Sequence, residues 1–113
     1  MILVTGATGQ IGGAVLGHLA DATGVRALVR EPTELGDAEV VVGSFDDAGS
    51  LAVALDGVET VFLTGRDNPD QVEQHARVLA VAQDAGVRHV VKLSAIGARA
   101  DSPVALMRWH HAI

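Results

Sequence analysis

The N-terminal segment constrains the fold of this chain more than any other part of the sequence. A short apolar run, Ile2–Val4, predicts a buried strand, and the glycine-rich turn Gly6–Gly13 follows it and opens a helix at Gln10. Glycines permit positive φ angles and let a backbone approach a pyrophosphate closely, while a helix N-terminus offers free amides and a positive dipole end. A tight turn whose glycines serve packing alone is the competing interpretation. The strand before the turn and the helix after it favour phosphate binding.

Short β-rich runs and helical stretches alternate along the whole chain. The predicted strands are Ile2–Val4, Val25–Val29, Val40–Val42, Thr60–Leu63 and His89–Leu93, and the predicted helices are Gln10 to about Ala20, Ser50–Leu55, Gln71–Ala85 and a last one that begins near Pro103. Strands that are apolar on both faces and alternate with helices indicate a parallel sheet covered on both sides. Right-handed crossovers then predict a doubly wound, Rossmann-like α/β fold with strand order 3-2-1-4-5. We expect residues 1–113 to form one NAD(P)-binding domain.

The composition excludes several classes of partner and site. The chain carries a net charge of −6, and its 8 Lys and Arg residues form no stripe, which argues against nucleic-acid binding. Cysteine is absent, so disulfides and thiolate metal sites are excluded, and no other metal site is expected. No apolar run approaches the roughly 20 residues that span a bilayer, and the N-terminus lacks the basic region of a signal peptide. We therefore expect a cytoplasmic protein that contacts no membrane.

The end of the second predicted strand bears on the choice of cofactor. Arg30 follows Gly9 by 21 residues. Near this position an acidic residue bonds the ribose 2′-hydroxyl of NAD, whereas an arginine accommodates the 2′-phosphate of NADP. Glu31 is adjacent and can serve the ribose instead, and Arg30 can also be a solvated residue at a strand end. The motif favours NADP, with NAD as the alternative.

Four stretches of the chain resemble the NmrA-like branch of the atypical short-chain dehydrogenases: ILVTGATGQIGGAV, ALVR, VVVGSFDDAGSLAVALDGVETVFL and VRHVVKLSAIGA. The resemblance implies that the glycine turn lines the pyrophosphate, that Arg30 lies near the adenosine ribose, and that the third strand ends at the adenine. It also implies that the residues at the end of the fourth strand run beside the cofactor and that Ser94 approaches the nicotinamide. Together, the turn and the resemblance predict these cofactor-binding residues: Gly6, Thr8, Gly9, Gln10, Ile11, Gly12, Arg30, Ser44, Phe45, Leu63, Thr64, Gly65 and Ser94.

The chain departs from the pattern of the resembled family in several places. It contains no tyrosine, so it lacks the Tyr-x-x-x-Lys pair that supplies a general acid in most short-chain dehydrogenases, a pair that many NmrA-like members lack too. Ser44 stands where the family usually carries an aspartate after a glycine, although its hydroxyl can still form a hydrogen bond. Family members continue well beyond the position of Ile113. We therefore expect this chain to be an N-terminal portion, truncated in the helix after the fifth strand, with the substrate-binding portion absent and that strand left as an exposed edge.

Two adjacent histidines near the end of the chain are the candidates for catalysis. The resemblance places the helix of His110 and His111 near the nicotinamide, where a histidine can donate a proton to a reduced carbonyl or quinone. The competing interpretation, which we favour, is a pair of surface histidines of which one is partly packed. No partner residue for either histidine follows from the sequence.

Other polar residues are expected to be structural. His75 lies in the middle of a predicted helix, and Lys92 alternates with apolar residues in the fifth strand and is expected to reach past the strand end. Asp46 and Asp47 are expected to cap the short helix that follows them, instead of forming a catalytic carboxylate pair.

The helix Gln71–Ala85 carries a wide apolar surface. The stripe consists of Val72, Ala76, Leu79 and Ala80 and is widened by Val78, Val81 and Ala82. Its width suits burial against the sheet and contact with a partner helix. Since this helix joins a dimer interface in many short-chain dehydrogenases, the resemblance makes a homodimer one candidate assembly.

Three functions remain open from the sequence. The first is an NADPH-dependent oxidoreductase that transfers hydride to a quinone or another small carbonyl substrate. The second is a non-catalytic NAD(P) redox sensor that acts on a regulatory protein partner, which the missing Tyr-x-x-x-Lys pair favours. The third is a Rossmann fragment that binds no cofactor.

Overall fold

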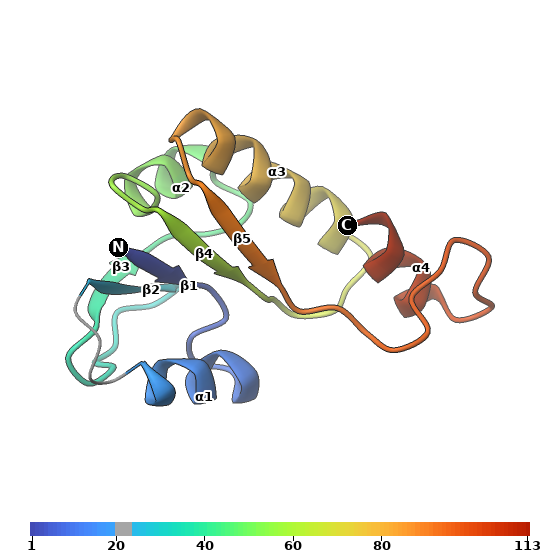
Figure 1. Ribbon diagram of the computed structural model, residues 1–113, viewed down its shortest axis with the longest axis horizontal. Helices are drawn as coiled ribbons and strands as arrows, with labels where there is room; N and C mark the ends of the chain where they lie inside the picture. Colours follow the sequence, from blue (N-terminus) through green and yellow to red (C-terminus); the bar gives the residue numbers. More distant parts are fainter. Residues whose placement is uncertain (20–23) are drawn as a thin grey trace.

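Five parallel strands form one sheet in the order β3-β2-β1-β4-β5 in the computed structural model, which describes residues 1–19 and 24–113 (Figure 1). The strands are β1 (Ile2–Val4), β2 (Val25–Val29), β3 (Glu39–Val42), β4 (Thr60–Leu63) and β5 (His89–Lys92), and the helices are α1 (Gln10–His18), α2 (Ala48–Ala54), α3 (Gln71–Asp84) and α4 (Ala105–Ala112). The predicted α/β class and the predicted strand order are confirmed. All neighbouring strands run parallel, so their carboxyl ends lie along one edge of the sheet.

Element boundaries differ from the prediction by a residue or two. The second helix begins at Ala48, before the predicted Ser50, because Asp47 is its N-cap and accepts a hydrogen bond from the Ser50 amide at 3.2 Å. The last helix begins at Ala105, just after the predicted start near Pro103, since the backbone at Val104 is still extended. The predicted end of the first helix near residue 20 lies outside the described residues.

Helices cover both faces of the sheet. α2 and α3 lie on one face and α1 lies on the other (Figure 1). The core under α2 and α3 contains Leu3, Leu51 and Leu63, all fully buried, and the core under α1 contains the fully buried Val4 and Ala27. Because successive residues of a strand point to opposite faces, the short central strand β1 contributes to both cores.

The side chain of Thr5 extends the junction between β1 and β4 beyond their last residue pair. Its Oγ1 accepts a hydrogen bond from the Thr64 amide at 2.9 Å and lies 2.8 Å from the Thr64 carbonyl oxygen and 3.0 Å from that of Phe62, either of which can receive its proton. Thr5 is fully buried. The strand order reverses between β1 and β4, so Thr5 fixes the main chain at the switch point where ligands bind in such sheets.

Four residues of α3 are buried where the helix packs on the described part of the molecule: Gln71, His75, Val78 and Ala82. Two of them are polar, which is why the apolar pattern of the sequence did not single out this stripe. Ala76 and Ala80 of the predicted stripe are exposed. The sequence predicted that this stripe packs against the sheet and contacts a partner helix. Since Ala76 and Ala80 are not buried against the sheet, only the contact with a partner helix remains open to them.

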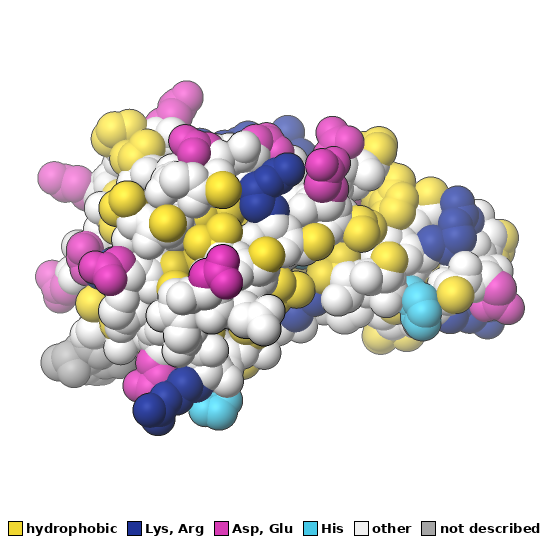
Figure 2. Space-filling view, turned by 90° about the horizontal axis from the view of Figure 1, so that it is seen from above, with side chains coloured by type: hydrophobic (Ala, Val, Ile, Leu, Met, Phe, Trp, Pro, Cys, Tyr) yellow, Lys and Arg dark blue, Asp and Glu magenta, His cyan; other side chains and the backbone are white. Residues whose placement is uncertain are grey.

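The fifth strand lies outermost beside β4, as expected, and it is thinly covered. Val90 and Val91 are 41% and 55% exposed, and Leu93 and Ile96 after the strand are exposed as well. On the face seen in Figure 2, hydrophobic side chains reach the surface between scattered charged ones. Within the described chain, every helix is too short or too polar to cross a lipid bilayer.

Candidate functional site

A crevice of about 200 Å³ opens at the carboxyl ends of β1, β2, β3 and β4. This is the edge at which open α/β sheets bind ligands. Seven of the predicted cofactor-binding residues line it: Gly6, Thr8, Arg30, Ser44, Phe45, Thr64 and Gly65. They come from four separate loops, so the fold brings together residues that are distant in the sequence. A larger hollow of about 820 Å³ lies at the opposite edge, beside Met1, Gly24 and Glu39, where the strands begin.

The glycine turn lets α1 approach the end of β1 closely. Gly6 has a φ of +60°, and a Cβ on it would lie 2.7 Å from Cγ2 of Thr64. A Cβ on Gly12 would overlap the carbonyl oxygen of Gly6. The N-cap residue, Gly9, has no side chain to cap the helix, so the first amides of α1 remain open to an external acceptor. The turn therefore presents amides and a positive helix end to an anion.

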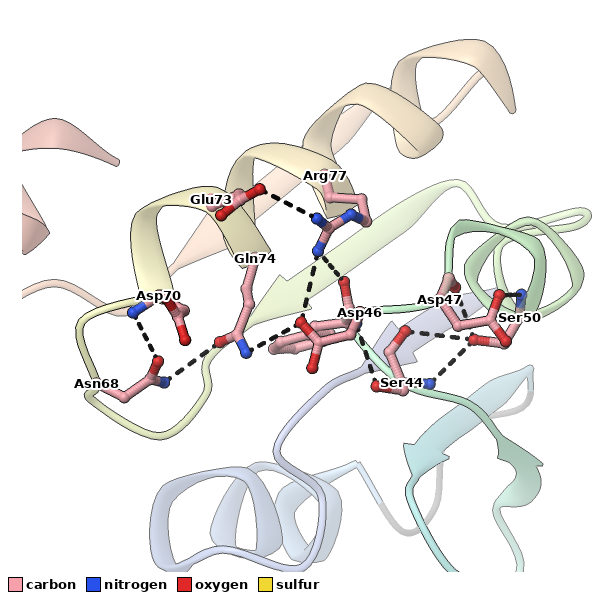
Figure 3. A network of polar contacts seen from close by, with 10 residues as sticks. Ser44, Asp46, Asp47, Ser50, Asn68, Asp70, Glu73, Gln74 and Arg77 are labelled. Carbon is pink, nitrogen blue, oxygen red and sulfur yellow. Dashed lines mark hydrogen bonds and ion pairs between the residues drawn. The ribbon is translucent and has the colours of Figure 1, made fainter.

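A polar network on α3 holds two walls of the crevice in place (Figure 3). Arg77 donates a hydrogen bond to the carbonyl oxygen of Phe45 at 2.7 Å and forms an ion pair with Asp46 at 3.6 Å. Gln74 donates to the Asp46 carboxylate at 3.3 Å and accepts from the Asn68 amide group at 3.2 Å. The loop after β3 and the loop after β4 are therefore both fastened to one helix. Asp46 binds α3 and does not cap α2, so of the two predicted caps only Asp47 is confirmed.

Ser44 lines the crevice and also stabilises its own turn. Its Oγ accepts a hydrogen bond from the Asp46 amide at 3.1 Å, and its amide donates to Oγ of Ser50 at 3.0 Å (Figure 3). Because the oxygen acts as an acceptor in this turn, the hydroxyl proton is left for a ligand. Serine can therefore occupy this wall of the crevice where the resembled family usually carries aspartate.

The other predicted cofactor residues lie outside the crevice wall. Three of them form the exposed start of α1 next to Thr8, namely Gly9, Gln10 and Ile11, while Gly12 is buried behind the turn. Leu63 is fully buried in the core, which leaves only its main chain for a ligand. Ser94 is exposed beyond the end of β5. Their contacts with a cofactor stay predictions.

A second group of polar side chains gathers at the carboxyl ends of β4 and β5. Nε2 of His110 lies 2.9 Å from Oδ1 of Asp67, and its Nδ1 lies 3.3 Å from Nζ of Lys92. Lys92 also donates to the carbonyl oxygen of Leu93 at 2.8 Å, so it turns toward its own strand end. The side chain of His110 is 8% exposed, whereas His111 is exposed. One histidine of the pair is thus packed, and it has two charged partners that the sequence did not identify.

Two buried polar residues of α3 lie on the same helix face, one turn apart. His75 and Gln71 are each 1% exposed, and among residues 1–19 and 24–113 no group forms a hydrogen bond with the His75 ring or the Gln71 side-chain amide. Burial, and then the charges of Lys92 and His110, lower the pKa of His75 to about 4, so its ring is neutral at pH 7. Burial also lowers the pKa of Lys92. The spacing of Gln71 and His75 in the sequence places them on one face of a helix. Because both are polar, however, the sequence predicts that this face is exposed to solvent, and it did not identify the two residues as buried.

The comparisons with known proteins agree with this geometry. A family model described as NAD(P)H-binding matches residues 6–113. The chain is 50% identical over 98 residues to a (4-alkanoyl-5-oxo-2,5-dihydrofuran-3-yl)methyl phosphate reductase of Streptomyces griseus. This match covers 83% of this chain and 34% of that protein.

Among the solved structures that share the fold are two oxidoreductases with a bound cofactor. The triphenylmethane reductase of Citrobacter sp., complexed with NADP(H), has a TM-score of 0.86 and 33% identity, and the match covers 99% of this chain and 43% of that one. An NADPH-dependent quinone oxidoreductase of Escherichia coli, complexed with NADPH, has a TM-score of 0.86 and 31% identity, covering 99% of this chain and 42% of that one. The chain thus spans between 34% and 43% of the length of these three proteins.

The close approach of α1 to the turn predicts a sharp difference between two glycines of the same helix. Gly12→Ala should lower the free energy of unfolding by about 1–3 kcal/mol or more, because the new methyl group overlaps the Gly6 carbonyl oxygen. Gly17→Ala is the matched control, since nothing lies within 4 Å of its Cβ position, and it should raise stability by about 0.5–1 kcal/mol. Urea denaturation measures both. Equal effects of the two substitutions would contradict this account of the turn.

The buried, neutral His75 predicts that stability falls on acidification. Its pKa is about 4 in the folded chain against 6.5 for a free histidine, so the unfolded chain takes up the proton first as the pH drops. The contribution of His75 to the free energy of unfolding should therefore be constant above pH 6.5 and fall by at most about 1.4 kcal/mol per pH unit toward pH 4. In His75→Leu, the part of the dependence of the unfolding free energy on pH that comes from His75 should be absent. Urea denaturation between pH 6.5 and pH 4 measures this. His18→Gln, a change at an exposed histidine, should keep the wild-type slope.

Proposed function

This chain belongs to the NAD(P)H-binding family, in the NmrA-like branch of the atypical short-chain dehydrogenases, and we propose that it is the cofactor-binding part of an NADPH-dependent oxidoreductase. Its substrate in this proposal is a quinone or another small carbonyl compound. The observation that carries the proposal is the crevice at the switch point of the sheet, which gathers a glycine turn, an arginine and a hydroxyl group from separate loops.

The residues present fit a dinucleotide. The open amides at the start of α1 provide a cradle for a pyrophosphate, and glycine at position 12 lets the helix pack closely enough on the Gly6 main chain to hold those amides at the turn. Ser44 and Phe45 line the wall expected for the adenine, and Thr64 and Gly65 line the path beyond it. The bound nicotinamide would supply a hydride, and the chain's residues would hold and orient it.

Arg30 supports NADPH over NADH. It is exposed, lines the crevice, and forms no ion pair with the residues that the structure describes. A guanidinium in this position can bind a 2′-phosphate through two parallel hydrogen bonds. Glu31 next to it is also exposed and is the residue that would favour NADH instead.

The substrate class rests on similarity to proteins that are longer than this chain. The relatives are, by their names, reductases of a furanone phosphate, of triphenylmethane dyes and of quinones, and two of them are complexed with NADP(H) or NADPH. Reduction of a conjugated or carbonyl acceptor by hydride transfer is the chemistry we propose for this chain.

A redox sensor is the second candidate, and the absence of tyrosine from the sequence favours it. Without the usual Tyr-x-x-x-Lys acid, a chain of this fold can bind a dinucleotide and report its redox state to a regulatory protein. Such a sensor would bind NADPH and NADP with different affinities and would oxidise neither quinones nor carbonyl compounds.

Cofactor titration followed by turnover separates these functions. We expect NADPH to bind with an increase in nicotinamide fluorescence and then to be oxidised when 1,4-benzoquinone is added, measured by the loss of nicotinamide absorbance. Binding without oxidation would favour the sensor. Absence of binding by both NADPH and NADH would exclude both functions and leave a fold without a cofactor.

Arg30→Ala should weaken NADPH binding by about 10- to 100-fold, because a charge-assisted contact with the phosphate is worth about 1.5–3 kcal/mol. NADH affinity should change by less than about 3-fold, since NADH has no 2′-phosphate. Arg88→Ala is the control: this exposed arginine lies at the opposite edge of the sheet, just before β5, and its loss should leave both affinities unchanged. Equal losses for NADPH and NADH in Arg30→Ala would rule out the phosphate contact.

A further inference from the structure

Three titratable side chains from three different elements meet at the carboxyl end of β5. Lys92 is the last residue of β5, Asp67 lies in the loop after β4, and His110 lies on α4. His110 is 43 residues from Asp67 and 18 from Lys92 along the chain, and it contacts both through its two ring nitrogens. Asp67 also lies between Arg66 and Asn68, which line the crevice. The group therefore adjoins the proposed cofactor site at the edge where a substrate would enter.

The donors and acceptors of this group fix where its protons lie. A lysine ammonium only donates hydrogen bonds, so Nδ1 of His110 accepts from Lys92. The proton of the neutral ring is then on Nε2 and is donated to the Asp67 carboxylate. The three groups form a continuous chain of hydrogen bonds from a half-exposed carboxylate, through an almost buried imidazole, to an ammonium. One hydrogen of the ammonium goes to the Leu93 carbonyl, one goes to His110, and the third has no partner among the described residues.

We propose that Asp67, His110 and Lys92 are a proton relay in which Lys92 donates a proton to the oxygen of a bound quinone or carbonyl substrate. The inference rests on the proposed function and assigns to it an acid within these 113 residues, which contain no tyrosine. Lys92 is the catalytic residue, because its free N–H group can touch the substrate oxygen. His110 and Asp67 are positioning residues that act through Lys92.

The step balances with the hydride that a reduced nicotinamide cofactor supplies. The substrate carbon gains the hydride with its electron pair, the carbon–oxygen π bond breaks toward oxygen, and the oxygen takes the proton from Nζ of Lys92. Lys92 is left as a neutral amine. The ring of His110 then takes a proton from solvent at Nδ1, keeps its Nε2 proton on the hydrogen bond to Asp67, and passes the Nδ1 proton to the amine, so the relay ends in its starting state.

The groups that face Lys92 set its proton affinity. The neighbouring element α3 contributes His75, which is neutral at pH 7 and adds no charge there. The loop after β4 contributes the Asp67 carboxylate, which raises the pKa of Lys92, and burial lowers it by more. A lysine with a lowered pKa gives up its proton more easily near neutral pH than an exposed one. The charge of the whole group, −1 on Asp67 and +1 on Lys92, is balanced when the ring of His110 is neutral.

The sequence makes this group unusually easy to test, because Lys92 is the single lysine of the chain. Reductive methylation with ¹³C-formaldehyde labels its amine and the terminal amine, and NMR separates the two signals. We expect Lys92 to titrate below the ordinary range of lysine, and Asp67→Asn to lower its pKa further because the carboxylate is lost. Nitrogen-15 NMR of histidine should report His110 as the Nε2–H tautomer at neutral pH, and the Nδ1 resonance should move in Lys92→Met, which removes the hydrogen bond that Nδ1 accepts. His18→Gln, at an exposed histidine of α1, should leave both signals unchanged.

Turnover with NADPH and 1,4-benzoquinone tests the catalytic part. Lys92→Met should lower kcat by about 100-fold or more, as expected for the loss of a general acid, while the NADPH affinity stays within about 2-fold. Lys92→Arg keeps the charge but cannot release the proton, so it should be as slow as Lys92→Met. His110→Gln should lower kcat less and should shift the basic limb of the pH profile of kcat, where Lys92 loses its proton. Full activity of Lys92→Arg would overturn the relay in favour of charge stabilisation alone.

Failure of the relay and failure of the proposed function give different results. If the wild-type protein oxidises NADPH but Lys92→Met turns over within about 3-fold of it, the relay is wrong and the oxidoreductase proposal stands. If the wild-type protein does not oxidise NADPH, the oxidoreductase proposal fails and the acid role of Lys92 fails with it. An ordinary lysine pKa together with a His110 Nδ1 resonance that does not move in Lys92→Met would overturn the relay by itself, whatever the activity.

Discussion

The fit of α1 against the turn after β1 is the contact on which the rest of the site depends. A Cβ on Gly12 would overlap the Gly6 carbonyl oxygen, so any larger residue would push the helix away from the strand end. With glycine there, the first turn of the helix sits at the same edge as the ends of β2, β3 and β4. Thr5 fixes the other side by joining the ends of β1 and β4. These two packing constraints create a crevice lined by main-chain groups, which is the kind of surface that binds a pyrophosphate.

The helix α3 organises both polar groups at this edge. Through Arg77 and Gln74 it fastens the two loops that form the crevice walls, and its buried face carries His75 and Gln71 toward the ends of β4 and β5. Buried polar groups without partners lower stability, and here they lie beside titratable residues at a ligand-binding edge. The same helix thus carries a structural cost at the edge of the sheet where the proposed cofactor site lies.

The strands and the glycine turn could be predicted because each depends on local sequence, and the strand order could be predicted because right-handed crossovers restrict how parallel strands are arranged. Apolar runs such as Val25–Val29 set the strands, and alternation with helices sets a parallel sheet. Helix ends were less predictable, since the start of α2 depends on the Asp47 cap and that of α4 on the extended backbone at Val104. The packed stripe of α3 was missed in part, because two of its buried residues are polar and hydrophobic periodicity does not register them.

The sequence by itself determined the α/β fold, the glycine turn and seven of the residues that line the crevice, because a strand, a glycine turn and a helix form largely through contacts between residues close in the chain. Only the tertiary structure decided which polar residues act together. Asp67, Lys92 and His110 belong to separate elements with no motif in common, and their contact follows from how α4 packs at the ends of β4 and β5. The folded chain also distinguishes the two adjacent histidines, because neighbours on a helix point about 100° apart and only His110 faces the interior.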